Sequence, residues 1–322
     1  MSEQRTFAGL AWEGKGKVTR REQFLGEMNA VVPWARLMSV VEPHYPKGSG
    51  GRPAMDLGVM LRIYFVQQWF DLSDPAAEDA IYDSESIRRF VGVELSEDRV
   101  PDETTILRFR HLLEKHDLTE AIFAEVRSLL EEKRLLLKSG TIVDATIIHA
   151  PSSTKNKSGK RDPEMKQTRK GNAWYFGMKV HTGTDKRGLT HHLTVTNAAQ
   201  ADIKQMPELL HGAEREVYGD QAYWKEDDRR SFKARNVRYR VNRRPTAKNP
   251  LTDHWKKINR SRSRVRARGE HAYRVVKRQW GFDKVRYRGL AKNKARAYTL
   301  FALANLYMVR QKLMPPGATC IR

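Results

Sequence analysis

The sequence predicts a helical region followed by an α/β domain, and three observations support this division. Apolar residues recur at helical spacing through most of the first 138 residues. At Ser139 the pattern changes to runs rich in β-branched residues, beginning with Thr141–His149, TIVDATIIH. The charge changes as well: from Trp224 to Arg296 there are 26 Lys and Arg but only 6 Asp and Glu, which accounts for 20 of the net charge of +22.

The concentration of positive charge in one 73-residue segment predicts a polyanion as partner. Binding should depend strongly on salt, because cations of the protein release counterions condensed on the polyanion. The longest apolar stretch is too short to span a bilayer and no signal peptide opens the chain, so we expect a soluble, cytoplasmic protein without membrane contact. The single cysteine, Cys320, excludes a disulfide or a thiolate zinc site within one chain.

The helical region divides into two predicted parts. Residues 1–50 form an arm with one helix, within Phe24–Val41, that is a possible subunit contact. Residues 51–138 form a helical domain with three apolar faces, and Ser73-Asp74-Pro75 opens one of its helices. We interpret this domain as DNA-binding, with 104–111 as the candidate reading helix, although a plain packing bundle fits the pattern equally well.

Residues 139–297 form the predicted α/β domain, and a C-terminal helix and tail follow at 298–322. The elements expected in this order are a strand with Asp144 at its centre, a basic loop at 150–171, two strands, a helix at 202–211, a strand ending at Asp220, a helix, a strand, and a long helix, 261–282, that carries Glu270. This is the element order of an RNase H-like fold with a mixed sheet. On the long helix, a core-facing stripe is expected at Val265, Gly269, Ala272, Val276 and Trp280.

Three acidic residues occur in unusual settings, and each also has a structural interpretation. Asp144 is the one charge in an apolar strand, which is costly unless it has a partner or faces water at a sheet edge. Asp220 ends a strand where α/β folds place ligand groups, but it is also a good helix N-cap. Glu270 is the only acid from Val265 to Arg278, and it could simply pair with Arg266.

The fold would bring these three carboxylates together at one edge of the sheet, where they could hold two divalent cations about 4 Å apart. Oxygen ligands with open positions favour Mg²⁺, for which Mn²⁺ can substitute. His191 and His192 are expected on opposite faces of a strand and therefore not in a shared metal site.

At this point the sequence resembles the bacterial insertion-sequence DDE transposases of the family numbered five. The resemblance extends over nearly the whole chain, in stretches such as FLGEMNAVVPW, TIVDATIIHAPSSTKN and RGEHAYRVVKRQWGFDKVRYRGLAKN. The family's signature of Tyr, two residues, Arg, three residues, Glu, six residues, Lys is matched by Arg266, Glu270 and Lys277, whereas the Tyr position is Ser263.

The resemblance implies that Asp144, Asp220 and Glu270 are the catalytic and metal-binding triad. Arg266 and Lys277 would hold phosphates, and Trp224 would stack on an unpaired base unless it is a core residue. Further expected DNA contacts are Arg264, Arg274, Lys155 and Lys157.

The implied function is an endonuclease and strand transferase that binds the terminal inverted repeats of an insertion sequence, frees 3′-OH ends and joins them to target DNA. Holding two ends together implies at least a homodimer on DNA, associated with the nucleoid. The alternatives are an RNase H-like nuclease without strand transfer, and a non-catalytic DNA-binding regulator.

Overall fold

A computed structural model describes residues 14–46, 53–157, 159–246 and 250–315. Part of the predicted N-terminal arm, most of the glycine-rich turn after Tyr45, and Cys320 lie outside these residues. The first part of the described chain is helical, in the order α2 (Arg20–Val31), α3 (Trp34–Val41), η1 (Glu42–His44), α4 (Leu57–Phe70), α5 (Asp74–Asp83), α6 (Glu85–Val91), α7 (Glu103–Lys115) and α8 (Leu118–Glu132). None of the described helices has the length and apolar character needed to cross a membrane.

Side chains cap the N-termini of several helices, as the sequence predicts for α5. Ser73 accepts a hydrogen bond from the backbone N–H of Ala76, so the predicted turn does open a helix. Asp56 caps α4 and Asp102 caps α7 in the same way. Each cap satisfies a backbone donor that would otherwise lack a partner in the first turn.

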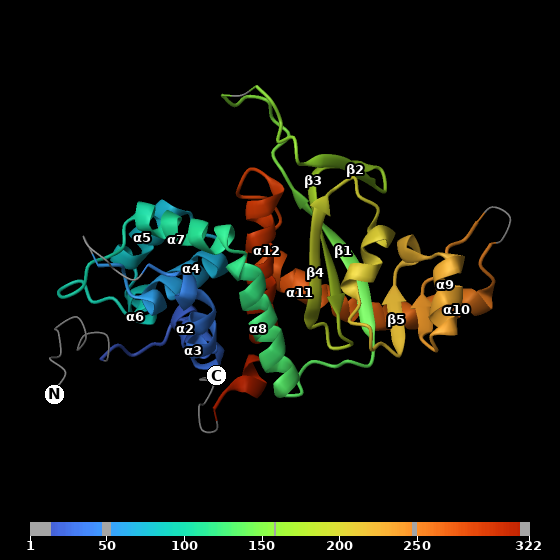
Figure 1. Ribbon diagram of the computed structural model, residues 1–322, viewed down its shortest axis with the longest axis horizontal. Coiled ribbons are helices and arrows are strands. Elements are labelled where there is room, and N and C mark those ends of the chain that lie inside the picture. The colour runs from blue at the N-terminus through green and yellow to red at the C-terminus, as the bar shows by residue number, and fades with distance from the viewer. Residues whose placement is uncertain (1–13, 47–52, 158, 247–249, 316–322) are drawn as a thin grey trace.

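The second part is a six-stranded mixed sheet with helices on its faces (Figure 1). Its strands are β1 (Thr141–His149), β2 (Lys166–Lys170), β3 (Ala173–Thr184), β4 (Thr190–Asn197), β5 (Glu216–Gly219) and β6 (Arg238–Val241). The order across the sheet is β4-β3-β1-β5-β6, antiparallel as far as β1 and parallel from β1 to β6. β2 pairs with the first residues of β3. A helical region followed by this sheet is the predicted RNase H-like architecture.

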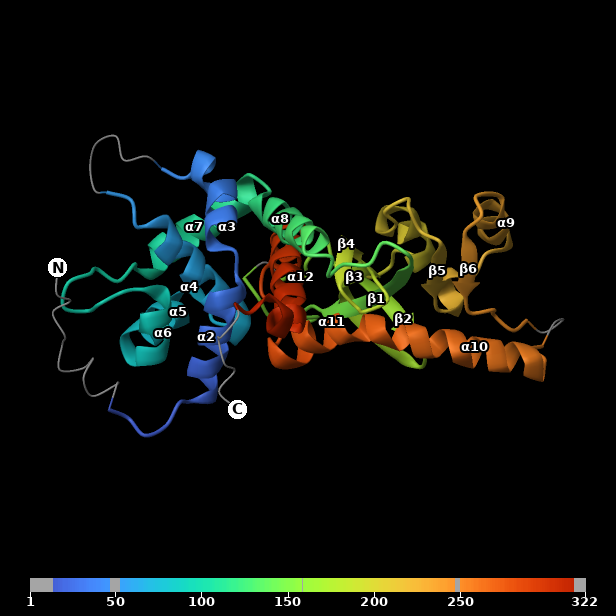
Figure 2. The same cartoon turned by 90° about the horizontal axis from the view of Figure 1, so that it is seen from below.

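The remaining elements are η2 (Asp202–Leu209), η3 (Gln221–Tyr223), α9 (Glu226–Ala234), α10 (Asp253–Arg266), η4 (Ala267–Gly269), α11 (Glu270–Arg274), η5 (Val275–Gln279) and α12 (Leu290–Leu313). In Figures 1 and 2, α9 and α10 lie at the end of the molecule opposite the N-terminal helices.

Three local predictions were wrong or incomplete. The predicted loop 150–171 contains β2, whose sequence KQTRK is polar on both faces and so lacks the alternation that marks a half-buried strand. The predicted helix at 202–211 is the 3₁₀ helix η2, which contains Pro207 and therefore lacks one backbone donor. The single helix predicted at 261–282 starts earlier, at Asp253. It includes a 3₁₀ turn at Ala267–Gly269 and a π-helical turn at Val275–Gln279.

The larger hydrophobic core joins the N-terminal helices to the α/β domain. It includes Phe65 of α4, Val126 of α8, Val180 of β3 and Phe301 of α12, each at most 1 % exposed. α12 therefore packs against both parts. Figure 1 shows it between the N-terminal helices and the sheet, beside α8. α12 crosses the predicted boundary at residue 297, and the domain limits stay a prediction. A smaller core around Val143 and Tyr239 fills the other face of the sheet.

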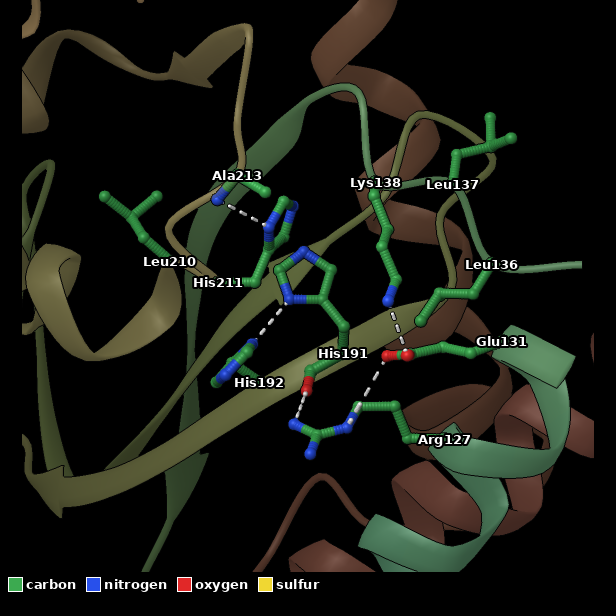
Figure 3. A pocket seen from close by; sticks show the side chains of 10 residues that line it. All are labelled: Arg127, Glu131, Leu136, Leu137, Lys138, His191, His192, Leu210, His211 and Ala213. Carbon is green, nitrogen blue, oxygen red and sulfur yellow. Dashed lines mark hydrogen bonds and ion pairs between the residues drawn. The ribbon is translucent and has the colours of Figure 1, made fainter. Parts of the chain in front are cut away.

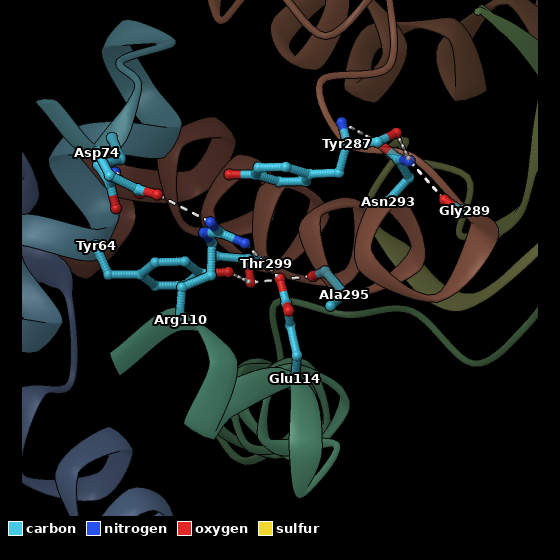
Figure 4. Close-up of polar contacts among 10 residues, drawn as sticks. Tyr64, Asp74, Arg110, Glu114, Tyr287, Gly289, Asn293, Ala295 and Thr299 are labelled. Carbon is cyan, nitrogen blue, oxygen red and sulfur yellow. Dashed lines mark hydrogen bonds and ion pairs between the residues drawn. The ribbon is translucent and has the colours of Figure 1, made fainter. Parts of the chain in front are cut away.

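A buried ionic network also links the two parts (Figure 4). Arg110 of α7 is 5 % exposed, and its guanidinium donates to Asp74 at 2.9 Å and to Glu114 at 3.0 Å. The same guanidinium lies 4.3 Å from the ring centre of Tyr287, in the segment before α12. Because a buried charge is costly without partners, this network holds that segment against the N-terminal helices.

Candidate active site

One arginine lies among the three acidic residues that the sequence singled out. Arg266 Nη1 is 3.9 Å from Asp144 Oδ1 and 3.9 Å from Asp220 Oδ2, and Arg266 Nη2 is 3.9 Å from Glu270 Oε1. Three carboxylates far apart along the chain therefore surround a single positive charge. These distances are longer than hydrogen bonds, so the attraction is mainly coulombic.

Asp144 lies at the middle of β1, opposite Thr182 of β3. Its side chain is 16 % exposed, and Oδ1 accepts a hydrogen bond from the backbone N–H of Ala145 at 3.0 Å. Burial raises the pKa of the Asp144 carboxyl to about 6, although the nearby Arg266 charge lowers it. A cation beside this carboxyl therefore stabilises its ionised form.

Strand pairing brings Asp220 next to Asp144. β1 and β5 run parallel, with Ile142 opposite Tyr218, and each acid follows two residues after its member of this pair. Asp220 Oδ1 accepts from the Ala222 N–H at 2.8 Å and caps η3, while Oδ2 faces Arg266. The N-cap interpretation of Asp220 is confirmed, and the ligand-binding interpretation stays a prediction that concerns the other oxygen, Oδ2.

Glu270 is the first residue of α11, and two contacts hold this helix against the sheet. A Cβ on the preceding Gly269 would lie 3.1 Å from Ile142 Cγ2 and 3.1 Å from Thr184 Oγ1, so only a glycine allows this close an approach without displacement. One turn later the Tyr273 hydroxyl hydrogen-bonds Thr182 Oγ1 at 2.6 Å. The Glu270 side chain remains 58 % exposed and is free to meet a ligand.

The carboxylates open into a cleft of about 1300 Å³ that follows β1. One wall consists of β1 from Asp144 to His149 together with residues 168–170 of β2, and the other consists of residues 266–283. Lys277 projects across the cleft, where its Nζ donates to the Ile147 carbonyl at 2.9 Å and to Thr146 Oγ1 at 3.3 Å. Burial lowers the pKa of the Lys277 ammonium.

The predicted DNA contacts fall into two groups. Arg266, Arg274 and Lys277 line the cleft. Arg264 on α10, and Lys155 and Lys157 in the loop before β2, are exposed but are not among the described residues that line it. Trp224 is also outside the described lining, and its ring packs 5.5 Å from that of Tyr239 beside the smaller core.

Two residues of the cleft, Asp202 and Lys179, were not predicted from the sequence. Lys179 Nζ donates to Asp202 Oδ1 at 2.8 Å, and both side chains line the cleft. Asp202 starts a 3₁₀ helix in a polar stretch, where nothing in the pattern distinguishes it from a surface residue. Lys179 lies between Met178 and Val180 of β3, and nothing in the local pattern distinguishes it from an ordinary strand residue.

A smaller pocket of about 330 Å³ lies between α8 and the start of β4, and three histidines line it (Figure 3). The prediction that His191 and His192 face opposite ways was wrong, because their Nδ1 atoms are 2.7 Å apart. The register of β3 and β4 shifts at Gly183/Thr184, which leaves His191 as an extra residue of a β-bulge. The bulge lets the His191 side chain point to the same side of the strand as that of His192. In the described parts of the chain, no three His, Cys, Asp or Glu side chains are close enough to hold one metal ion as they stand.

Comparisons with known proteins match both parts of the chain. Residues 13–112 match the family model described as "Transposase domain (DUF772)", and residues 136–306 match the one described as "Transposase DDE domain". A solved structure titled "Crystal structure of the Mos1 Strand Transfer Complex" is similar at 12 % identity with a TM-score of 0.20, over 74 % of this chain and 82 % of that one.

Proposed function

The chain belongs to the DDE transposases, and from this premise we propose that it binds the terminal inverted repeats of an insertion sequence, cleaves there to leave 3′-OH ends, and joins those ends to target DNA. Assignment to the family numbered five is part of the proposal. The observation that carries the proposal is the convergence of Asp144, Asp220 and Glu270 on the guanidinium of Arg266. This cluster lies inside a cleft that is otherwise rich in Lys and Arg.

The donor chemistry of this site fits divalent metal, which DDE transposase domains generally use. We assign Mg²⁺, as a pair of ions for which Mn²⁺ can substitute, to Asp144, Asp220 and Glu270. Bound there, the metal would activate the attacking oxygen and stabilise the leaving oxygen of a phosphodiester. The Arg266 guanidinium now lies where the three carboxylates converge, so binding would require this side chain to move aside.

The remaining residues of the cleft would position DNA. Lys277 and Arg274 lie further along the wall that carries Glu270, at places where phosphates of a strand bound over β1 would pass. Arg266, once displaced from the carboxylates, would be within reach of the phosphate being cut. Gly269 and Tyr273 contact the sheet, and we assign to them the role of fixing the position of Glu270 relative to Asp144.

Two DNA ends must be held together for joining, so we propose a homodimer on double-stranded DNA. The exposed Arg264, Lys155 and Lys157 are available for contacts outside the cleft, in the same complex or with target DNA. The stacking role first considered for Trp224 has less support, since its ring is partly covered by Tyr239.

A plasmid assay tests this function. Purified protein is incubated with Mg²⁺ and a plasmid that carries both ends of the element with their flanking DNA. Joined products support a transposase, nicks alone indicate a nuclease, and neither product with retained DNA binding indicates a regulator. The control is the triple variant Asp144→Asn, Asp220→Asn, Glu270→Gln purified in the same way, since nicks that persist without all three carboxylates come from a contaminating enzyme.

A further inference from the structure

An exposed tryptophan at the tip of the β2–β3 hairpin has no role in the site described above. The Trp174 side chain is 67 % exposed, more than any other large apolar side chain in the described residues. Solvent exposure of so large a ring is costly, which makes it a candidate contact for a partner.

The hairpin has the shape of a free two-stranded ribbon. The chain turns at Gly171–Asn172, with Gly171 at φ +59°, and Arg169 lies opposite Trp174. From Lys166 to Trp174 every side chain is exposed except that of Thr168, which is partly so, and therefore both faces of the ribbon are open. The major groove of B-DNA is wide enough to admit a two-stranded ribbon of this kind.

The charge of the ribbon favours DNA over a protein surface. Lys166, Arg169 and Lys170 lie in the ribbon, and the sequence from Met165 to Gly177 contains no Asp or Glu. Arg169 is held over the turn, where its guanidinium donates to the Gly171 carbonyl at 3.1 Å. A second copy of this chain would bring a net charge of +22 towards these cations, whereas a phosphate backbone complements them.

The ribbon continues the proposed path of DNA through the cleft. Residues 168–170 line the far end of the cleft, and the Tyr175 ring lies 5.2 Å from that of His149 at the end of β1. Trp174 lies eight residues along β3 from Thr182, the partner of Asp144, in the register of the sheet. At strand spacing this is about 27 Å. The same length of B-DNA contains about eight base pairs.

We propose that the β2–β3 ribbon enters the major groove of the bound DNA about eight base pairs from the phosphate that is cut. Trp174 packs its ring against sugars and base edges there, and Lys166 contacts a phosphate. This inference rests on the proposed function, because the carboxylates define where the DNA is cut. It adds a contact in the major groove to the proposed DNA-binding surface, at Trp174, for which the sequence alone predicted no role.

The test is a binding titration of the full chain, without Mg²⁺, on a labelled duplex of mixed sequence about three helical turns long, at a series of salt concentrations. Trp174→Ala should weaken binding about five- to hundredfold through loss of buried apolar surface. Lys166→Ala should reduce the slope of log K against log salt by about 0.9. The matched control is Lys312→Ala, an exposed lysine near the end of α12, which should leave affinity and slope unchanged.

Both ribbon positions are exposed, so the variants should melt at the wild-type temperature, and Lys166→Ala gives a second readout if Trp174→Ala does not fold. Wild-type affinity and slope in both ribbon variants would overturn the inference while leaving the proposed function intact. A changed oligomeric state with unchanged DNA affinity would also overturn it, because the ribbon would then contact protein. If the wild-type chain binds no duplex at all, this inference and the proposed function fail together.

Discussion

Arg266 occupies the position of a counter-ion to Asp144, with its Nη1 atom 3.9 Å from the Oδ1 atom of the carboxylate. The same guanidinium faces Asp220 and Glu270, and its Nε atom is buried without a hydrogen-bond partner. The side chain is therefore held mainly by charge attraction and lacks the geometry of a fixed structural arginine. A stronger cation at the carboxylates would compete with it directly.

We expect Arg266→Ala to bind divalent metal more tightly than the wild type. Removing the competing charge should lower the Kd for Mn²⁺ by about tenfold or more, since 1.4 kcal/mol of coulombic energy suffices for that change. Calorimetric titration of the protein without DNA measures it independently of activity. Arg260→Ala, an exposed position on α10, is the control. Weaker Mn²⁺ binding by Arg266→Ala would show that the arginine helps to form the metal site.

Neutral isosteres of the triad should separate chemistry from binding. Asp144→Asn, Asp220→Asn and Glu270→Gln each remove a metal ligand but keep the side-chain shape, so cleavage should fall by several orders of magnitude. DNA affinity should be equal or higher, because each change removes a negative charge from a cationic cleft. Gel-based cleavage and binding assays measure the two effects. Glu226→Gln on the exposed face of α9 should cleave normally, and cleavage retained by any triad variant removes that residue from the site.

The sequence predicted the triad because each acid lies in a local pattern that restricts its surroundings. Asp144 interrupts a run of β-branched residues, and Asp220 lies at the C-terminal end of a short strand. Parallel pairing of β1 with β5 then brings the two acids side by side, because each follows its paired residue, Ile142 or Tyr218, by two positions. The core-facing stripe of the long helix is confirmed at Gly269, Ala272, Val276 and Trp280, which are buried, whereas its first member, Val265, is only half-buried.

The missed features depend on tertiary contacts that leave no periodic signal. The interaction of Arg266 with three acids requires the end of α10 to lie beside the middle of β1 and the end of β5, whereas helical spacing alone shows only the Glu270 pair. β2 forms because the Gly171–Asn172 turn returns the chain to β3, although its own residues are polar. The contact of His191 with His192 depends on a one-residue bulge, which a strict period of two cannot reveal.

We expect Gly269→Ala to destabilise the protein and impair catalysis. Its Cβ would approach both Ile142 and Thr184 to 3.1 Å, so α11 must move away from β1 at a cost of about 1–3 kcal/mol. That movement carries Glu270 away from Asp144, and cleavage should fall more than DNA binding. Gly26→Ala on the exposed face of α2, where nothing lies within 4 Å, should instead stabilise by about 0.5–1 kcal/mol. Chemical denaturation compares the two, and equal stability of both variants would contradict the close packing.

Lys277→Ala should weaken DNA binding and make its salt dependence shallower, by about 0.9 in the slope, if the ammonium contacts a phosphate. Without DNA, the Lys277 ammonium is bound to the Ile147 carbonyl, so the variant also loses that contact. Lys277→Arg keeps the charge and should keep the slope. An unchanged slope in Lys277→Ala would assign this residue to the structure of the cleft wall alone.

Acid should destabilise the protein through His181, whose side chain is fully buried in β3. Burial lowers the pKa of this imidazole from 6.5 to about 4, and the neutral ring hydrogen-bonds Thr196 Oγ1 at 2.8 Å. Because the folded-state pKa lies below the unfolded one, the unfolded chain binds the extra proton first. Stability is therefore complete above pH 6.5 and is lost as the pH falls from 6.5 towards 4, by at most about 3 kcal/mol for this group.

Replacing His181 by Gln isolates this contribution. Glutamine can still hydrogen-bond Thr196 but does not titrate, so the unfolding free energy of His181→Gln should fall less between pH 7 and pH 4 than that of the wild type. The comparison uses the difference between the two proteins, because burial also lowers the pKa of His191 and adds to the acid sensitivity of both. His254→Gln, at an exposed position on α10, should follow the wild-type curve. If His181→Gln follows it as well, the buried imidazole does not control the response to acid in this pH range.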